Sequence, residues 1–255
     1  MKHIPNCFTL INLFFGCIAV IYILQNGIII GADEETGAQF LQIPEKIWLG
    51  SLFIGLAAVV DFLDGFVARL FKATSEMGKQ LDSLADLVSF GVAPGMIVYQ
   101  FLRLSYTQEP NGMEVPITWL LPALLIPCAT AYRLARFNLD NSQQFGFKGV
   151  PAPAAGLLVA SIPLIYWYSE NPAAVDLLLN KWVWYAFVLV LSYLMVSTLP
   201  LMALKFKNFS VKDNWPKIIL LLLTIIVAIF LKWLAVPVVF ILYIIVSLAF
   251  KNKTT

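Results

Sequence analysis

Four aspartates lie in segments that are otherwise apolar, and they are the residues of this sequence best suited to chemistry. Asp61 and Asp64 interrupt one predicted helix, and Asp82 and Asp86 begin the next. A charge at bilayer depth costs about 2.5–3.5 kcal/mol on insertion scales, so two acids on one such helix need a partner. The pattern therefore indicates that the four carboxylates share a function.

Helical spacing places these acids on two faces that also carry small residues. At about 100° per residue, each helix presents its acids and its small residues on one side. The residues of the two faces are Asp61, Asp64, Gly65 and Ala68 on the first helix and Gly78, Asp82 and Asp86 on the second. The loop between the helices is short, so we expect antiparallel neighbours with opposed carboxylates.

Opposed carboxylates repel each other unless a cation lies between them. Ligand sets made only of oxygen suit hard divalent ions such as Mg²⁺ or Mn²⁺, so we expect a divalent metal site. The small residues would leave room for a ligand, although close helix packing explains them equally well. Two other interpretations of the acids stay open on spacing alone. An ion or proton transporter could also place four carboxylates in a membrane bundle, and acids near helix ends could simply be solvated.

Composition places the chain among integral membrane proteins. Of its 255 residues, 60% are hydrophobic and 13% are charged, whereas soluble domains average about 45–50% apolar and about 25% charged residues. The net charge is only +2, so nothing predicts a nucleic-acid partner. The three cysteines, Cys7, Cys17 and Cys128, have no metal or redox spacing, and we expect them to be apolar helix residues.

Apolar stretches separated by short polar loops predict an all-α fold, a polytopic membrane helix bundle of about eight transmembrane helices. The expected helices cover residues 8–30, 47–71, 79–102, 117–139, 151–169, 181–204, 215–232 and 234–250. The first stretch is longer than the apolar part of a signal peptide and no cleavage site follows it, so we expect it to span the membrane. Residues 232–237 could form a tight turn or a kink in one long helix.

Basic residues are distributed unevenly between the two sides that eight crossings would create. Thirteen of the 17 Lys and Arg residues fall on the side that holds both termini. The four on the other side are Lys46, Arg103, Lys181 and Lys232. Because cytoplasmic loops are enriched in Lys and Arg, we expect a multi-pass protein of the cell membrane whose four aspartates lie at the cytoplasmic face.

The segment from residue 61 to residue 86 also resembles a known signature. It reads Asp61-x-x-Asp64-Gly65-x-x-Ala68-Arg69, then eight residues, then Gly78-x-x-x-Asp82-x-x-x-Asp86. This pattern resembles the motif of the CDP-alcohol phosphatidyltransferases at all eight of its fixed positions. A match of that specificity argues strongly against the transporter interpretation.

Other segments resemble the phosphatidylserine synthases within that family. These segments are residues 5–12, 82–94, 132–138 and 149–153. The resemblance covers roughly residues 5–205, which implies a six-helix catalytic core over 1–205. The helix pair over 206–255 carries no recognised motif.

The resemblance implies a reaction, namely transfer of a phosphatidyl group from CDP-diacylglycerol to L-serine with release of CMP. Glycerol phosphate, inositol or an amino alcohol remain alternative acceptors. The implied metal ligands, for Mg²⁺ or Mn²⁺ and two ions, are Asp61, Asp64, Asp82 and Asp86, with Asp86 also the general base. The implied contacts to the CDP-lipid are Gly65, Ala68, Arg69, Gly78 and Asn12. Family members are typically dimers, so a homodimer among membrane lipids is expected.

Two arginines are candidates to bind the carboxylate that distinguishes serine from other alcohols. Arg133 and Arg136 are three residues apart on the predicted fourth helix, so they share one side of it. Arginine pairs with carboxylates in bidentate fashion, although both residues could instead be interfacial anchors. Of the two, Arg136 is the preferred candidate, because Asn138 and the following loop lie close to it. Asn12 has a similar alternative: it could form a hydrogen bond near the end of its helix instead of contacting the CDP-lipid. The only histidine, His3, offers no pairing for a covalent route, which favours direct transfer.

Overall fold

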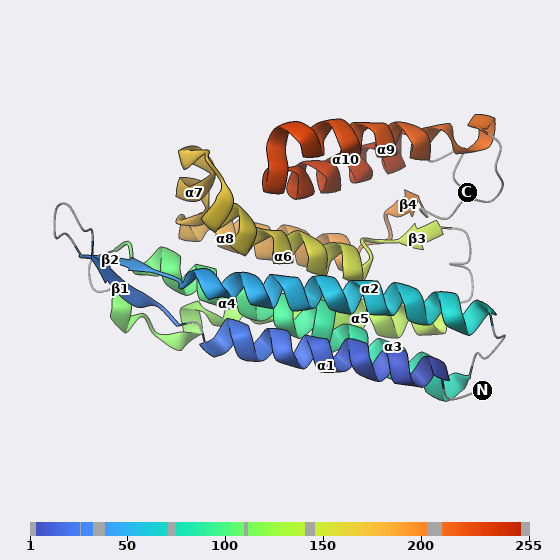
Figure 1. Ribbon diagram of the computed structural model, residues 1–255, viewed down its shortest axis with the longest axis horizontal. Coiled ribbons are helices and arrows are strands. Elements are labelled where there is room, and N and C mark those ends of the chain that lie inside the picture. Colours follow the sequence, from blue (N-terminus) through green and yellow to red (C-terminus); the bar gives the residue numbers. More distant parts are fainter. Residues whose placement is uncertain are drawn as a thin grey trace.

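The computed structural model of the protein describes residues 4–25, 27–32, 39–70, 75–109, 112–140, 146–202 and 211–250. Nearly all of this part of the chain is helical, which confirms the predicted all-α membrane bundle (Figure 1). The α-helices are α1 (Ile4–Gln25), α2 (Trp48–Leu70), α3 (Glu76–Leu87), α4 (Ala93–Tyr106), α5 (Leu125–Leu139), α6 (Ala152–Tyr168), α7 (Pro172–Leu178), α8 (Lys181–Val196), α9 (Val211–Leu231) and α10 (Ala235–Ala249).

Short elements join and interrupt these helices. Two antiparallel ribbons pair β1 (Ile29–Ala32) with β2 (Gln39–Gln42) and β3 (Gly146–Lys148) with β4 (Pro200–Met202). A π-helical segment, η2 (Val88–Val92), continues α3 directly into α4. The 3-10 turns are η1 (Glu45–Ile47), η3 (Gly112–Glu114), η4 (Ile117–Trp119), η5 (Leu121–Leu124) and η6 (Lys232–Leu234).

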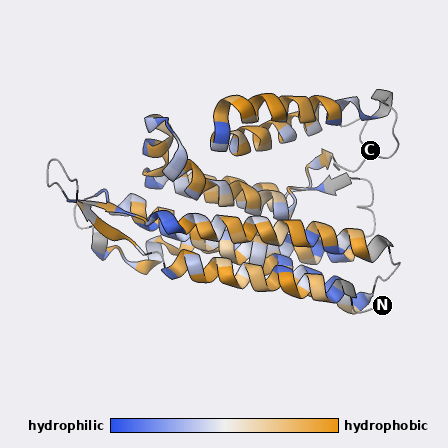
Figure 2. Cartoon of the chain, in the orientation of Figure 1, coloured by the Kyte–Doolittle hydropathy of each residue, from blue (hydrophilic) through white to orange (hydrophobic). Residues whose placement is uncertain are grey.

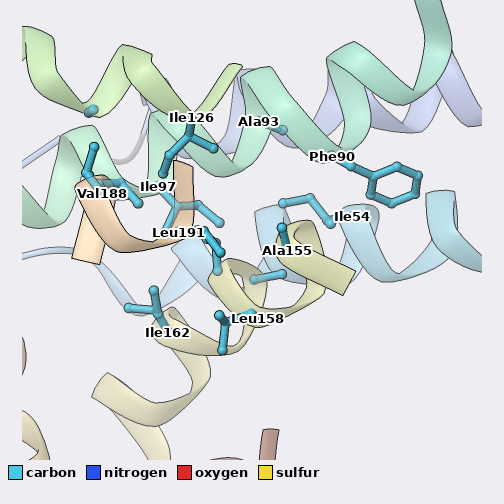
Figure 3. Close-up of a cluster of buried hydrophobic side chains, with 14 of the residues drawn as sticks. Ile54, Phe90, Ala93, Ile97, Ile126, Ala155, Leu158, Ile162, Val188 and Leu191 are labelled. Carbon is cyan, nitrogen blue, oxygen red and sulfur yellow. The ribbon is translucent and has the colours of Figure 1, made fainter. Parts of the chain in front are cut away.

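The core forms where the central helices meet. Helix α1 packs along α2 and also contacts α3 and α4, while α6 packs against α2 and α4, and α5 against α8. Figure 3 shows the buried side chains that these contacts bring together, among them Ile54 of α2, Ile97 of α4 and Leu191 of α8. In a membrane such interfaces depend on close van der Waals packing rather than on burial from water.

The predicted number of spans is not confirmed. By length and apolar composition, four helical segments in the described part of the chain could cross a membrane, or five if the bent pair α7 and α8 counts as one span. Each of the eight predicted ranges does contain a helix, but α5 and α6 are only 15 and 17 residues long. At 1.5 Å per residue such helices fall short of the roughly 30 Å hydrocarbon core.

The last of the four candidate segments, Asn214–Ala249, is folded back on itself rather than straight. At η6 the backbone of Lys232 takes a positive φ of 49°, and α9 and α10 pack against each other as a hairpin (Figure 1). The residues that were ambiguous in the sequence therefore form a turn. Figure 2 shows that the hairpin consists mostly of hydrophobic residues. It contacts the rest of the bundle through α10 with α6 and β4, and through η6 with α6.

Three predicted helix boundaries are wrong. The helix expected over 8–30 ends at Gln25, because residues 29–32 pair with β2. The helix expected over 181–204 ends at Val196, because residues 200–202 pair with β3. The one expected over 117–139 begins with two 3-10 turns and becomes α-helical only at Leu125.

Polar contacts mark the two ends of the bundle. At the end where α1 begins and α10 ends, Lys79 Nζ donates to the carbonyl oxygen of Asn138 over 2.7 Å. At the opposite end, Lys181 pairs with Glu109 and Lys232 with Glu170, each at 2.6 Å. Which of these ends faces the cytoplasm stays a prediction.

Candidate active site

The four aspartates lie at the end of the bundle where α1 begins. Asp61 and Asp64 are in the last three turns of α2, and Asp82 and Asp86 are in α3. Helix α3 starts at a defined point, because the Ser75 side chain caps it by accepting a hydrogen bond from the N–H of Gly78 at 3.0 Å. Helix α1 packs against both α2 and α3, so it borders the site along its first turns.

Three of the acids form one cluster. Asp61, Asp82 and Asp86 each place a carboxylate oxygen within 4.8 Å of the others. Asp64 is not part of this group, although its charge is close enough to interact with those of Asp61 and Asp82. One oxygen of Asp64 accepts a hydrogen bond from the Thr9 hydroxyl, and the other is buried without a hydrogen-bond partner among the described residues.

The donor set fits a hard divalent cation. The three ion pairs between described residues are Lys148–Asp140, Lys181–Glu109 and Lys232–Glu170, so none of them neutralises the cluster. Like charges held this close repel each other, and either a bound cation or protonation relieves the repulsion. Carboxylate oxygens are the ligands that Mg²⁺ and Mn²⁺ prefer, and the structure brings three of the four predicted ligands together for such an ion.

The small residues of the signature differ in what surrounds them. A Cβ atom added at Gly65 would meet nothing within 4 Å, so this face of α2 borders open space. A Cβ atom at Gly78 would approach Ser75 Oγ at 3.1 Å and Asn6 Oδ1 at 3.2 Å, so Gly78 sits in a packed junction. The side chains of Ala68 and Arg69 lie outside the described part of the structure, although both residues belong to α2.

Asn12 is fully buried and contacts the cluster directly. Its side-chain Nδ2 donates to Asp86 Oδ1 over 3.2 Å. Its backbone carbonyl oxygen accepts from the Ser89 hydroxyl at 3.0 Å. Asn12 was a candidate from the sequence, but Ser89 was not, because nothing in the sequence alone indicates that it faces α1.

The two candidate arginines occupy different environments. Arg133 is buried, its Nε has no hydrogen-bond partner among the described residues, and its charge interacts favourably with Asp86. Arg136 donates to the backbone carbonyl oxygens of Val196, Lys148 and Ser197 at 2.6, 3.1 and 2.8 Å. The structure thus brings Arg133 to the acidic site, while Arg136 binds the chain around the β3–β4 ribbon.

One residue near Arg133 comes from a segment without any recognised motif. Tyr243 of α10 is buried, its hydroxyl donates to the carbonyl oxygen of Met202 at 2.9 Å, and it lies within electrostatic range of Arg133. Because tyrosines are common in apolar helices, the sequence does not indicate that Tyr243 would lie near Arg133. The C-terminal hairpin therefore reaches the side of the bundle on which Arg133 lies.

Comparison with known proteins identifies the family. The sequence model of the CDP-alcohol phosphatidyltransferases matches residues 2–180, which include every aspartate and arginine discussed above. The chain belongs to this family. The matched region of this CDP-alcohol phosphatidyltransferase contains α1 to α7, and the hairpin of α9 and α10 lies beyond it.

Three relatives of this CDP-alcohol phosphatidyltransferase share one name. A CDP-diacylglycerol–serine O-phosphatidyltransferase of Helicobacter pylori is 31% identical over 225 residues, which are 86% of this chain and 78% of the relative. A protein of the same name in Bacillus subtilis is 32% identical over 166 residues, 65% of this chain and 78% of the relative. A third protein of this name, in Saccharomyces cerevisiae, is 33% identical over 166 residues, which are 62% of this chain and 52% of the relative.

Proposed function

We propose that this protein transfers a phosphatidyl group from CDP-diacylglycerol to L-serine and releases CMP. The observation that carries the proposal is the cluster of Asp61, Asp82 and Asp86 at the end of a membrane bundle. The complete family signature and the names of the relatives support the same reaction. The names of the relatives favour serine over other alcohols as the acceptor.

The four aspartates would hold two divalent ions, Mg²⁺ or Mn²⁺. The ligands would be the clustered carboxylates of Asp61, Asp82 and Asp86. Asp64 would add its second oxygen, the one that does not accept the hydrogen bond from Thr9. Bound ions would neutralise the pyrophosphate of the CDP-lipid and stabilise the leaving oxygen of CMP. The carboxylates would hold that positive charge at the end of the bundle where α1 begins.

The nucleotide would lie along the face of α2 that carries Gly65. The open space beside Gly65 supports this placement, because a larger side chain would project into it. Ala68 and Arg69 continue the same helix and would contact the nucleotide and its phosphates, and Gly78 would permit the close junction at the start of α3. Asn12 would act on the nucleotide only indirectly, because its side chain is buried and bonded to Asp86.

The chemistry requires one bond to form and one to break at the phosphorus of the phosphatidyl group. The serine hydroxyl oxygen attacks that phosphorus, and the bond to the CMP oxygen breaks. Asp86 would take the hydroxyl proton, since a carboxylate near the attacking oxygen raises its nucleophilicity. Arg133 would bind the serine carboxylate, because its charge interacts favourably with that of Asp86 and its buried Nε has no hydrogen-bond partner among the described residues.

The distribution of basic residues indicates the face of the membrane at which the reaction would occur. The excess of Lys and Arg at the site end supports a cell-membrane protein with its active site at the cytoplasmic face. Residues 1–205 would form the catalytic core, and residues 206–255 would be an addition that packs on it through α10. The protein would act as a homodimer among membrane lipids, as members of the family typically do.

An acceptor screen tests this function. Purified protein receives CDP-diacylglycerol, Mg²⁺ or Mn²⁺, and one acceptor at a time from L-serine, glycerol 3-phosphate, inositol and ethanolamine, while CMP and the lipid product are quantified. We expect CMP and phosphatidylserine to form in equal amounts with serine, and little CMP with the other acceptors. Preference for another acceptor would reassign the substrate, and absence of CMP with every acceptor would favour a transporter.

A further inference from the structure

Two buried polar side chains of α1 each bind a different aspartate of the site. Thr9 is 3% exposed and Asn12 is 0% exposed, although both belong to an apolar helix. Being three residues apart, they share one face of α1. Thr9 donates to Asp64 of α2, and Asn12 donates to Asp86 of α3. Helix α1 therefore bonds to both acid-bearing helices at once.

The position of Asn12 is itself fixed from the other side. The Ser89 hydroxyl donates to the Asn12 carbonyl oxygen at 3.0 Å, and Ser89 lies in the π-helical segment η2 just after Asp86. One helical turn further along α1, a Cβ atom on Gly16 would lie 3.0 Å from Ser89 Cα and would overlap its hydroxyl. Glycine is thus required for this close approach of α1 to η2, and π-helical segments of this kind often occur at functional sites.

The direction of these hydrogen bonds decides what they do to the carboxylates. An ionised carboxylate only accepts hydrogen bonds, so the Asn12 amide must present its Nδ2 group to Asp86. The bond occupies Oδ1 of Asp86, and the Thr9 bond occupies Oδ2 of Asp64. Each aspartate keeps one oxygen for another ligand. For Asp64 that oxygen is buried and has no hydrogen-bond partner among the described residues.

We propose that Thr9 and Asn12 are positioning residues that orient Asp64 and Asp86 toward the metal ions from α1. This inference rests on the metal site of the proposed function and deepens it. Residues that bond to metal ligands fix the orientation of those ligands, and their loss typically costs 10- to 100-fold in metal affinity. Neither residue touches the substrate in this account, so the nucleotide contact first expected of Asn12 is replaced by an indirect role.

The test compares variants that keep shape but lose the donor. Thr9→Val and Asn12→Leu remove the two hydrogen bonds, and Thr9→Ser keeps the hydroxyl. Thr130→Val serves as the control, because Thr130 is equally buried but its hydroxyl bonds the Ile126 carbonyl oxygen of its own helix, at 2.8 Å. Mn²⁺ affinity is measured on purified protein without substrate, by electron paramagnetic resonance of the free ion, together with the thermal unfolding midpoint.

The proposal expects Thr9→Val and Asn12→Leu to weaken Mn²⁺ binding by about 10- to 100-fold. Thr9→Ser and Thr130→Val should stay close to the native affinity, and the KM for CDP-diacylglycerol at saturating metal should change little. Native Mn²⁺ affinity in both loss variants would overturn the proposal, as would a raised KM for CDP-diacylglycerol with unchanged metal binding. Because Mn²⁺ binding is read without substrate, failure of serine transfer in the native protein would refute the proposed function separately.

Discussion

Arg136 Nη1 donates a hydrogen bond of 2.6 Å to the backbone carbonyl oxygen of Val196, the last residue of α8. Its Nη2 atom donates to two further carbonyl oxygens, those of Lys148 and Ser197. One guanidinium thus joins the end of α5 to the end of α8 and to β3. This geometry distinguishes two arginines that the sequence places on one side of the same helix.

Arg136→Ala should mainly lower stability. A hydrogen bond to a charged group contributes about 1.5–3 kcal/mol, and removing this side chain leaves three carbonyl oxygens without their donor. We expect a lower thermal unfolding midpoint in detergent or nanodiscs, while the KM for serine in the folded fraction stays near the native value. A variant with native stability and a raised serine KM would show that Arg136 binds substrate instead.

Arg133→Ala should mainly affect serine. Loss of a charge-assisted hydrogen bond to the serine carboxylate, about 1.5–3 kcal/mol, corresponds to an increase in the serine KM of about 10- to 150-fold. The KM for CDP-diacylglycerol should change much less. Arg103→Ala, in α4 at the opposite end of the bundle, is the matched control. If Arg133→Ala weakens the CDP-lipid and leaves serine unaffected, Arg133 binds phosphate rather than the acceptor.

Two glycines of α2 provide a test of the nucleotide position. A Cβ atom meets nothing within 4 Å at either Gly55 or Gly65, so alanine fits at both positions without disturbing the fold. If the nucleotide fills the space beside Gly65, Gly65→Ala should raise the KM for CDP-diacylglycerol by about tenfold, equivalent to about 1.4 kcal/mol. Gly55→Ala should not. Equal kinetic constants for the two variants would remove the nucleotide from this face.

The orientation in the membrane can be read from two single cysteines. In a background without Cys7, Cys17 and Cys128, a cysteine is introduced at Ser75, which caps α3 at the site end, or at Ser169, which follows α6 at the opposite end. A membrane-impermeant maleimide should label Ser169→Cys in intact cells and Ser75→Cys only after permeabilisation. Labelling of Ser75→Cys from outside would reverse the orientation and move the active site to the other face.

The acidic cluster was predictable because its information is local. Asp82 and Asp86 are four residues apart, so helical periodicity places them on one face of their helix. The short loop to the helix of Asp61 then predicted that the two acidic faces would oppose each other. The partners of these acids were less predictable. Asn12 and Asp86 are separated by 74 positions, and only the packing of α1 against α3 brings them together.

Helix ends and spans were harder to predict for a related reason. The ends at Gln25 and Val196 depend on strand pairing with segments elsewhere in the chain, and hydropathy does not report pairing. The same holds for the hairpin, where the apolar composition of α9 and α10 fits one long helix as well as two. The positive φ of Lys232 at the turn is a property of the folded backbone.

The central claim is that a carboxylate-bound divalent metal supports phosphatidyl transfer to serine. The most direct measurement follows radiolabelled L-serine into lipid with purified protein and CDP-diacylglycerol, in chelator and after Mg²⁺ or Mn²⁺ is restored. The native protein should be inactive in chelator and recover with metal, and Asp61→Asn and Asp82→Asn should lose nearly all turnover while unfolding at the native temperature. Asp176→Asn, in α7 at the opposite end, should behave as native. Full transfer in excess chelator, or undiminished transfer by Asp61→Asn, would contradict the account.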